Sequence, residues 1–181
     1  MLPKLTLVIG GAASGKSMWA ERLVAQASDA RVYLATFQPG LAGQDAEMTE
    51  KLRLHRERRG TGWRTEEAGA DLLPALTGTR KGECVLLDCA TMWLGSLAAA
   101  AGDMGLAGPK MLAALAQCPA PVVVVTNEMG LSMVPETAEA RAFRQAHGAM
   151  NQALAAHADL VVTVMAGLPL VLRGTLPADA T

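Results

Sequence analysis

Aromatic residues are scarce in this chain, since only 3% of its 181 residues are Phe, Trp or Tyr. Single-stranded nucleic acid is usually bound by stacking on such rings, and duplex binding needs a surplus of positive charge. The formal net charge is −1, and the one basic cluster runs from Lys51 to Arg59. The composition therefore argues against nucleic acid as a partner.

Long apolar runs and paired cysteines are lacking as well. No segment reaches the roughly 18 uninterrupted apolar residues of a membrane span, and the apolar run before Gly10 is too short for a signal sequence. Cys84, Cys89 and Cys118 form no C-x-x-C pair, so buried free thiols are expected rather than zinc ligands. These features predict a cytoplasmic protein with no membrane span.

The chain is instead rich in residues that build a core. It is 51% hydrophobic and 18% charged, and its 181 residues fit one compact unit. Because aromatic residues are few, this core must consist mainly of Ala, Val, Leu and Met. We expect residues 1–181 to form a single nucleotide-binding domain, for the reasons given below.

Short apolar runs alternate with stretches of helical periodicity. The runs predict buried strands at 5–9, 32–36, 85–88, 122–126 and 160–164. Helices are expected at 16–27, at about 45–59 after an N-cap at Asp45, and within 138–158, with a loop at 37–44 and a loose end at 174–181. This alternation is typical of an α/β fold with a mostly parallel sheet and helices on both faces.

One motif follows the first predicted strand and indicates what the protein binds. The residues between this strand and the first helix fit G-x-x-x-x-G-K-[ST]: Gly10, Gly11, Ala12, Ala13, Ser14, Gly15, Lys16 and Ser17. In such a phosphate-binding loop (P-loop), backbone N–H groups and the helix N-terminus surround the phosphates. Lys16 would reach the β- and γ-phosphate oxygens, and Ser17 would bind Mg²⁺. The spacing and the flanking elements predict a P-loop NTPase-like nucleotide-binding fold.

Two further segments lie at predicted strand ends, where ligands of open α/β sheets bind. Asp88 closes the run 85–87, so its carboxylate is a candidate metal ligand. The alternative is a cap for a helix that begins at Ala90 or Thr91. Thr126, Asn127 and Glu128 follow another strand and are either ligands or a simple turn.

Histidine is present three times. His55 lies in a predicted helix among Arg56, Arg58 and Arg59, whose guanidinium groups suit phosphate. On composition alone, however, a lone histidine and a basic cluster on a helix are usually a solvated face. His147 and His157 lie in the Ala-rich helix and are expected to be structural or surface residues.

Several narrow motifs occur together, in order, over most of the chain. They are Tyr33-Leu34-Ala35-Thr36, Asp45-Ala46-Glu47-Met48, His55-Arg56 with Arg59, Trp63-Arg64-Thr65-Glu66-Glu67, Leu86-Leu87-Asp88-Cys89, and Val124-Val125-Thr126-Asn127-Glu128-Met129-Gly130 with Val134-Pro135-Glu136. With the P-loop, they resemble the bifunctional adenosylcobinamide kinase and adenosylcobinamide-phosphate guanylyltransferase family of cobalamin biosynthesis.

This resemblance implies two reactions. Adenosylcobinamide is first phosphorylated by ATP or GTP, and GMP is then transferred from GTP to adenosylcobinamide phosphate through a GMP-histidine intermediate on His55. The resemblance also implies Lys16 as a catalytic residue, Mg²⁺ held by Ser17 and Asp88, and a homotrimer. Besides the P-loop, the implied nucleotide contacts are Ala35, Thr36, Phe37, Arg56, Glu57, Arg58, Arg59, Glu67 and Asp88.

The chain departs from the family pattern at two positions. Many members have Arg where this chain has Ala13, and often Pro where it has Gly60. Neither departure removes a reacting group. The loss of an arginine beside the phosphates would either weaken triphosphate binding or shift the balance between the two activities. Two other hypotheses remain from the residues: a small-molecule kinase with His55 as a bystander, and a regulatory switch that binds GTP without turnover.

Overall fold

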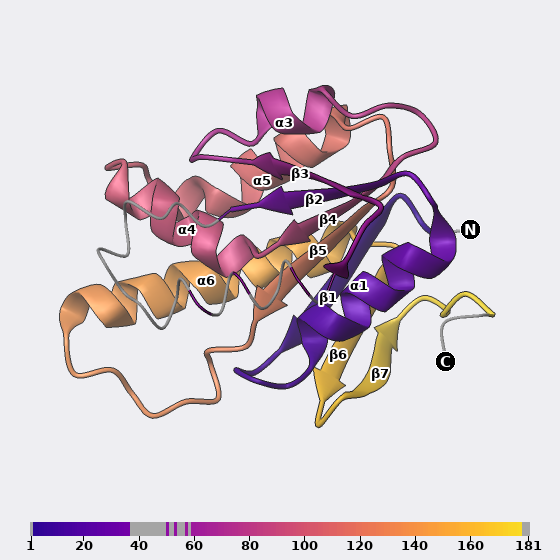
Figure 1. Ribbon diagram of the computed structural model, residues 1–181. Coiled ribbons are helices and arrows are strands. Elements are labelled where there is room, and N and C mark those ends of the chain that lie inside the picture. Colours follow the sequence, from indigo (N-terminus) through magenta and orange to yellow (C-terminus); the bar gives the residue numbers. More distant parts are fainter. Residues whose placement is uncertain (1, 37–49, 51–52, 54–56, 58, 179–181) are drawn as a thin grey trace.

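The computed structural model describes residues 2–36, 50, 53, 57 and 59–178 (Figure 1). Its strands are β1 (Leu5–Gly10), β2 (Arg31–Ala35), β3 (Trp63–Glu67), β4 (Cys84–Asp88), β5 (Val122–Asn127), β6 (Leu160–Met165) and β7 (Leu168–Arg173). Its helices are α1 (Lys16–Ala27), α3 (Leu73–Thr77), α4 (Ala90–Ala99), the short 3₁₀ helix η2 (Met104–Leu106), α5 (Ala107–Gln117) and α6 (Ala138–His157).

The strands form one sheet in the order β3-β2-β4-β5-β1-β6-β7. All neighbouring strands from β3 to β6 run parallel, and only β7 is antiparallel to β6. The carboxyl ends of the parallel strands therefore meet at one edge of the sheet. This arrangement confirms the predicted α/β class with a mostly parallel sheet.

Helices cover both faces of this sheet, which explains why the central strands are apolar on both sides. Trp19, Leu23 and Val24 of α1 pack on one face, against side chains such as Val8 and Val125. The other face packs against α3, α4, α5 and α6, which lie together behind the sheet in Figure 1. Among the described helices, α1 supplies most of the helical side chains on the first of these faces, and Met92 of α4 packs at its margin.

The apolar runs and the two long helices lie where the sequence predicts them, and α1 has the predicted bounds. Met150 and Leu154 of α6 are buried, and Phe143 packs against the same core. Strands β3 and β7 were not predicted. Both are edge strands with half-exposed or exposed residues, so neither shows the continuous apolar pattern of a buried strand.

Several predictions fall at or beyond the limits of the described residues. The loop 37–44 and the cap Asp45 lie outside them. Glu50, Arg53, Glu57 and Arg59 are helical, in agreement with the helix predicted there. Within the described residues, no helix is long and apolar enough to cross a membrane.

Candidate nucleotide-binding site

The P-loop connects the end of β1 to the start of α1, as its motif requires. Gly15 precedes the helix with φ of +89°, in the left-handed region that favours glycine. Lys16 is the first residue of α1, and its Nζ donates a hydrogen bond of 3.1 Å to the carbonyl of Gly11. The lysine is thereby folded over the loop, at the helix end that attracts anions.

The turn between β6 and β7 supports the loop from the side. The amide of Gly167 donates a hydrogen bond of 2.8 Å to the carbonyl of Ser14. A Cβ atom on Gly15 would lie only 3.1 Å from the Cα of Gly167. Ala13, where many family members have arginine, is exposed and has φ of +55°, so a longer side chain there would meet solvent.

The first glycine of the motif is required by packing. A Cβ atom on Gly10 would lie 2.7 Å from the carbonyl oxygen of Val164 and closer still to Oγ of Ser14. We therefore expect Gly10→Ala to lower the free energy of unfolding by about 2 kcal/mol, through overpacking. Gly11→Ala is the matched control, because a Cβ there meets no atom within 4 Å. If chemical denaturation showed the same loss of unfolding free energy for both variants, this explanation would be contradicted.

Strand register brings three predicted site residues to the same edge. Ala35 at the end of β2 pairs with Glu67 of β3 on one side and with Asp88 of β4 on the other. Gly10 pairs with Asn127, whose neighbour Glu128 donates its amide to the carbonyl of Gly10 over 3.0 Å. The P-loop strand and the strand of Asp88 are thus separated only by β5.

Thr36 ties the end of β2 to the residue after Asp88. Its buried hydroxyl donates to the carbonyl of Cys89 over 2.7 Å and accepts from the amide of Cys89 over 2.9 Å. Burial, and then the charge of Asp88, raise the pKa of the Cys89 thiol to about 11, while Lys16 acts in the opposite direction. The thiol therefore stays protonated at neutral pH, and the three cysteines are buried and free, as predicted.

Asp88 is half-buried and contacts Tyr33, a residue that sequence reasoning did not single out for a role. The Tyr33 hydroxyl lies 3.3 Å from Oδ2 of Asp88, and the guanidinium carbon of Arg59 lies 3.4 Å from the centre of the Tyr33 ring. Burial, followed by the charge of Asp88, raises the pKa of Tyr33 well above its ordinary value. The hydroxyl therefore stays protonated and donates a hydrogen bond to the carboxylate.

The oxygen donors at this edge fit a magnesium ion. Ser17 in the first turn of α1 offers a hydroxyl and Asp88 a carboxylate, and both are half-buried. Mg²⁺ is commonly held by one or two such groups together with water and substrate phosphates, rather than by a full protein cage. The described residues contain no group of three or more His, Cys, Asp or Glu side chains that could hold a metal ion.

The remaining predicted residues are placed only in part. Glu57 is exposed and forms an ion pair with Arg53 in the same helical segment. Glu67 is exposed at the end of β3. Phe37, His55, Arg56 and Arg58 lie outside the described residues.

A buried polar network around His147 lies next to the carboxyl end of β5. A structural role was one of the two expected for this histidine, but its partners were not predicted from the sequence. His147 of α6 is 1% exposed, and its Nε2 lies 2.9 Å from Oγ1 of Thr91 and 3.3 Å from Oγ1 of Thr126. Thr91 accepts the amide hydrogen of Asn127 over 2.9 Å, and Asn151 donates to the carbonyl of Asn127 over 3.1 Å. The network fixes the end of β5, which borders the P-loop strand.

His147 should make stability depend on pH. Burial lowers its pKa from the ordinary 6.5, while the charge of Glu128 acts in the opposite direction. Below pH 6.5 the unfolded chain therefore binds a proton that the folded chain refuses, so stability falls as pH falls towards the folded-state pKa. We expect a slope of at most about 1.4 kcal/mol per pH unit from this group. Denaturation of His147→Gln between pH 7.5 and 5.5 should show a shallower slope than wild type, whereas equal slopes would contradict this role.

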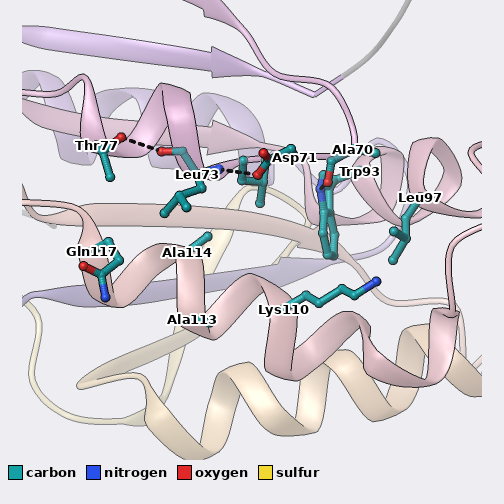
Figure 2. Close-up of a pocket in the computed structure, with 11 residues that line it drawn as sticks. Ala70, Asp71, Leu73, Thr77, Trp93, Leu97, Lys110, Ala113, Ala114 and Gln117 are labelled. Atoms are coloured by element: carbon teal, nitrogen blue, oxygen red, sulfur yellow. Dashed lines mark hydrogen bonds between the residues drawn. The ribbon is translucent and has the colours of Figure 1, made fainter.

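A pocket of about 720 Å³ lies elsewhere, between α3, α4 and α5 (Figure 2). Leu73, Trp93 and Ala114 supply apolar walls, Lys110 lies along one side, and the Trp93 indole donates to the carbonyl of Ala70 over 3.0 Å. None of the residues predicted to bind nucleotide or metal lines this pocket. The site is therefore defined by the sheet edge and the P-loop rather than by this cavity.

A glycine-rich loop that joins a buried strand to a helix at the carboxyl edge of a parallel sheet defines a P-loop nucleotide-binding protein. The fold agrees with a solved structure of a prototypical ATPase from the type III secretion system of pathogenic bacteria, with a TM-score of 0.53 at 13% identity. The match covers 88% of this chain and 50% of the ATPase. Because the identity is so low, the match shows the fold alone.

The family is identified by sequence. A model of the family described as cobinamide kinase / cobinamide phosphate guanyltransferase matches residues 6–172. The bifunctional adenosylcobalamin biosynthesis protein CobP of Pseudomonas aeruginosa is 38% identical, over 93% of this chain and 96% of its own length. The corresponding CobU protein of Salmonella typhimurium is 37% identical, over 91% and 97%.

The chain belongs to the cobinamide kinase and cobinamide phosphate guanyltransferase family. It is accordingly an enzyme of adenosylcobalamin biosynthesis that uses nucleotide and cobinamide substrates, which confirms the family and the substrates that the resemblance implied.

Proposed function

We propose that this enzyme phosphorylates adenosylcobinamide with ATP or GTP, and then guanylylates the product through a GMP-histidine intermediate on His55. The observation that carries this proposal is the placement of the P-loop and Asp88 at one sheet edge, in a chain that matches the family over residues 6–172. Family membership supports both activities, and the residue roles below extend the proposal to this chain.

In the first reaction, the hydroxyl of the aminopropanol group attacks the γ-phosphorus of the nucleotide. The bond from γ-phosphorus to the β–γ bridging oxygen breaks, the nucleoside diphosphate leaves, and the hydroxyl proton is released. Lys16 and the loop amides neutralise the negative charge that develops on the transferring group. Mg²⁺ bound by Ser17 and Asp88 would supply further neutralisation of the phosphate oxygens.

In the second reaction, a neutral imidazole nitrogen of His55 attacks the α-phosphorus of GTP, and pyrophosphate leaves. A phosphate oxygen of adenosylcobinamide phosphate then attacks the same phosphorus and displaces His55, which gives adenosylcobinamide-GDP. Covalent catalysis thus divides one transfer into two displacements. The P-loop serves again, because the leaving pyrophosphate needs the same cationic surroundings as the γ-phosphoryl group.

Product analysis tests this function. The full-length protein is incubated with adenosylcobinamide, Mg²⁺ and either ATP or GTP, and corrinoids are separated by chromatography. With GTP, we expect the phosphate to appear first and the GDP-linked product to follow, with one pyrophosphate per GMP transferred. Phosphate that accumulates without further conversion would favour the small-molecule kinase, and GTP binding with neither product would favour a switch.

We also propose a homotrimer and a cytoplasmic location, as the family resemblance implies. Large exposed apolar side chains support self-association. They include Leu131, Met133 and Val134 before α6, and Leu168 and Leu170 on β7. Apolar surface of this kind often marks contacts between subunits.

A further inference from the structure

Asn127 is a polar residue at the carboxyl edge of the sheet, and the proposed mechanism gives it no role. It ends β5, which lies between β1 with the P-loop and β4 with Asp88. Asn127 pairs in register with Gly10 of β1, whereas Asp88 pairs with Val125, two residues before Asn127. A phosphate chain that runs from the P-loop to a metal ion on Asp88 therefore passes over the end of β5.

The side chain of Asn127 lies on the face of the sheet that packs against α1. Successive side chains of a strand alternate between the two faces, and Val125 packs with the side chains of α1. Asn127, two residues later, is on the same face, while Thr126 between them points to the opposite face and bonds to α6. Asp88 shares the α1 face, because its partner Tyr33 packs there. Since the P-loop leads directly into α1, all three parts of the edge lie on one face.

Side chains from two helices hold both main-chain groups of Asn127. Its amide donates to Oγ1 of Thr91 in α4 over 2.9 Å, and its carbonyl accepts from Nδ2 of Asn151 in α6 over 3.1 Å. Oγ1 of Thr91 lies 2.9 Å from Nε2 of the buried His147, which fixes the hydroxyl in turn. The half-buried side chain of Asn127 takes no part in these hydrogen bonds. The carboxamide is therefore carried by a fixed main chain, at the edge where ligands of such sheets bind.

We propose that Asn127 is a further catalytic residue of the kinase reaction: its carboxamide N–H donates a hydrogen bond to the γ-phosphoryl group during transfer. This role rests on the proposed function. No bond to Asn127 forms or breaks, and the carboxamide adds to Lys16 in neutralising the charge on the γ-phosphoryl oxygens. Because its main chain is fixed beforehand, the donor needs little reorganisation during transfer. Asn127 is then a ligand rather than part of a simple turn, the two alternatives that the sequence leaves open.

The kinase rate of the full-length protein tests this role, with adenosylcobinamide, Mg²⁺ and whichever of ATP and GTP wild type uses faster. We expect Asn127→Ala and Asn127→Asp each to lower kcat by roughly 100-fold, as for the loss of one donor to a developing charge. KM for the nucleotide should change little in Asn127→Ala, because the contact is made mainly in the transition state.

Asn127→Asp separates a ligand from a turn. Aspartate suits a turn as well as asparagine does, but it has no N–H donor and repels the phosphate oxygens. A wild-type kcat in this variant would therefore overturn the inference. Gln145→Ala is the matched control, since it removes a carboxamide from the exposed face of α6 and should keep the wild-type rate.

A second readout requires no turnover. Aluminium fluoride with a nucleoside diphosphate and Mg²⁺ imitates the transferring phosphoryl group, and transition-state analogues bind more tightly than substrates. With adenosylcobinamide present, we expect Asn127→Ala to bind this complex roughly 100-fold more weakly than wild type, and to bind the diphosphate alone equally well. Equal affinity of both proteins for the aluminium fluoride complex would overturn the inference. So would an equal loss of affinity for the diphosphate alone, because the contact would then not be specific to transfer.

Failure of the proposed function would look different. A wild type that forms no adenosylcobinamide phosphate would refute the kinase reaction, while the aluminium fluoride comparison would still report on Asn127. A kcat loss in Asn127→Ala that is accompanied by a large fall in melting temperature would also overturn the inference, because the residue would then act through the fold.

Discussion

Replacement of Lys16 by methionine should abolish both reactions together. Methionine keeps the length and the apolar stem of lysine but removes the charge that neutralises the phosphate oxygens. We expect both the kinase rate and the guanylyl-transfer rate to fall by roughly 100- to 1,000-fold, the usual cost of removing a group that stabilises developing negative charge. Nucleotide affinity should fall as well, since in the proposed mechanism Lys16 contacts the triphosphate before either reaction.

The hydrogen bond from Lys16 to the carbonyl of Gly11 makes a control for folding necessary. Lys110 lies in a different helix and lines the pocket between α3, α4 and α5, so Lys110→Met is a suitable comparison. It removes one lysine without touching the P-loop, and both activities should persist. If Lys16→Met retained either activity near the wild-type rate, the proposal that both reactions share one phosphate site would be wrong.

Replacement of His55 by alanine should separate the two reactions. Guanylyl transfer should fall at least about 1,000-fold, because removal of a covalent nucleophile leaves only binding and charge stabilisation. Phosphorylation does not use the imidazole in the proposed mechanism, so adenosylcobinamide phosphate should accumulate at close to the wild-type rate. The readout is the same chromatographic separation of corrinoids over time.

His157→Ala is the matched control for this variant. His157 is exposed at the end of α6, and Nδ1 of its ring lies 2.9 Å from the carbonyl oxygen of Ala153. It should convert adenosylcobinamide fully to the GDP-linked product. A His55→Ala enzyme that still formed this product would show that GMP passes directly from GTP to the corrinoid phosphate.

The P-loop and the parallel sheet were predictable because their signals are local. A buried parallel strand needs a continuous apolar run, and the run 5–9 stops at Gly10, the first glycine that the phosphate loop requires. Asp88 was found in the same way, as a carboxylate at the end of an apolar run. Strand β3 could not be found, because its sequence Trp-Arg-Thr-Glu-Glu has the polar composition of an exposed edge.

Contacts between distant segments could not be predicted from the residues alone. In the sequence, Tyr33 is simply one residue of an apolar strand. Its contact with Asp88 depends on the pairing of β2 with β4, and its contact with Arg59 joins segments that are distant in the sequence. His147 reads as a lone histidine in an Ala-rich helix. Its burial results from the packing of α6 against the end of β5, where Thr91 and Thr126 satisfy its ring.

The covalent intermediate is most directly tested by incubating the full-length protein with Mg²⁺ and GTP labelled at the α-phosphate, followed by denaturing separation. Wild type and His157→Ala should retain label that is labile in acid and stable in alkali, as expected for a phosphorus–nitrogen bond to histidine, and His55→Ala should retain none. Absence of label on wild type, with GTP binding demonstrated in the same preparation, would contradict the GMP-histidine mechanism. Equal label on His55→Ala would place the bond on another residue.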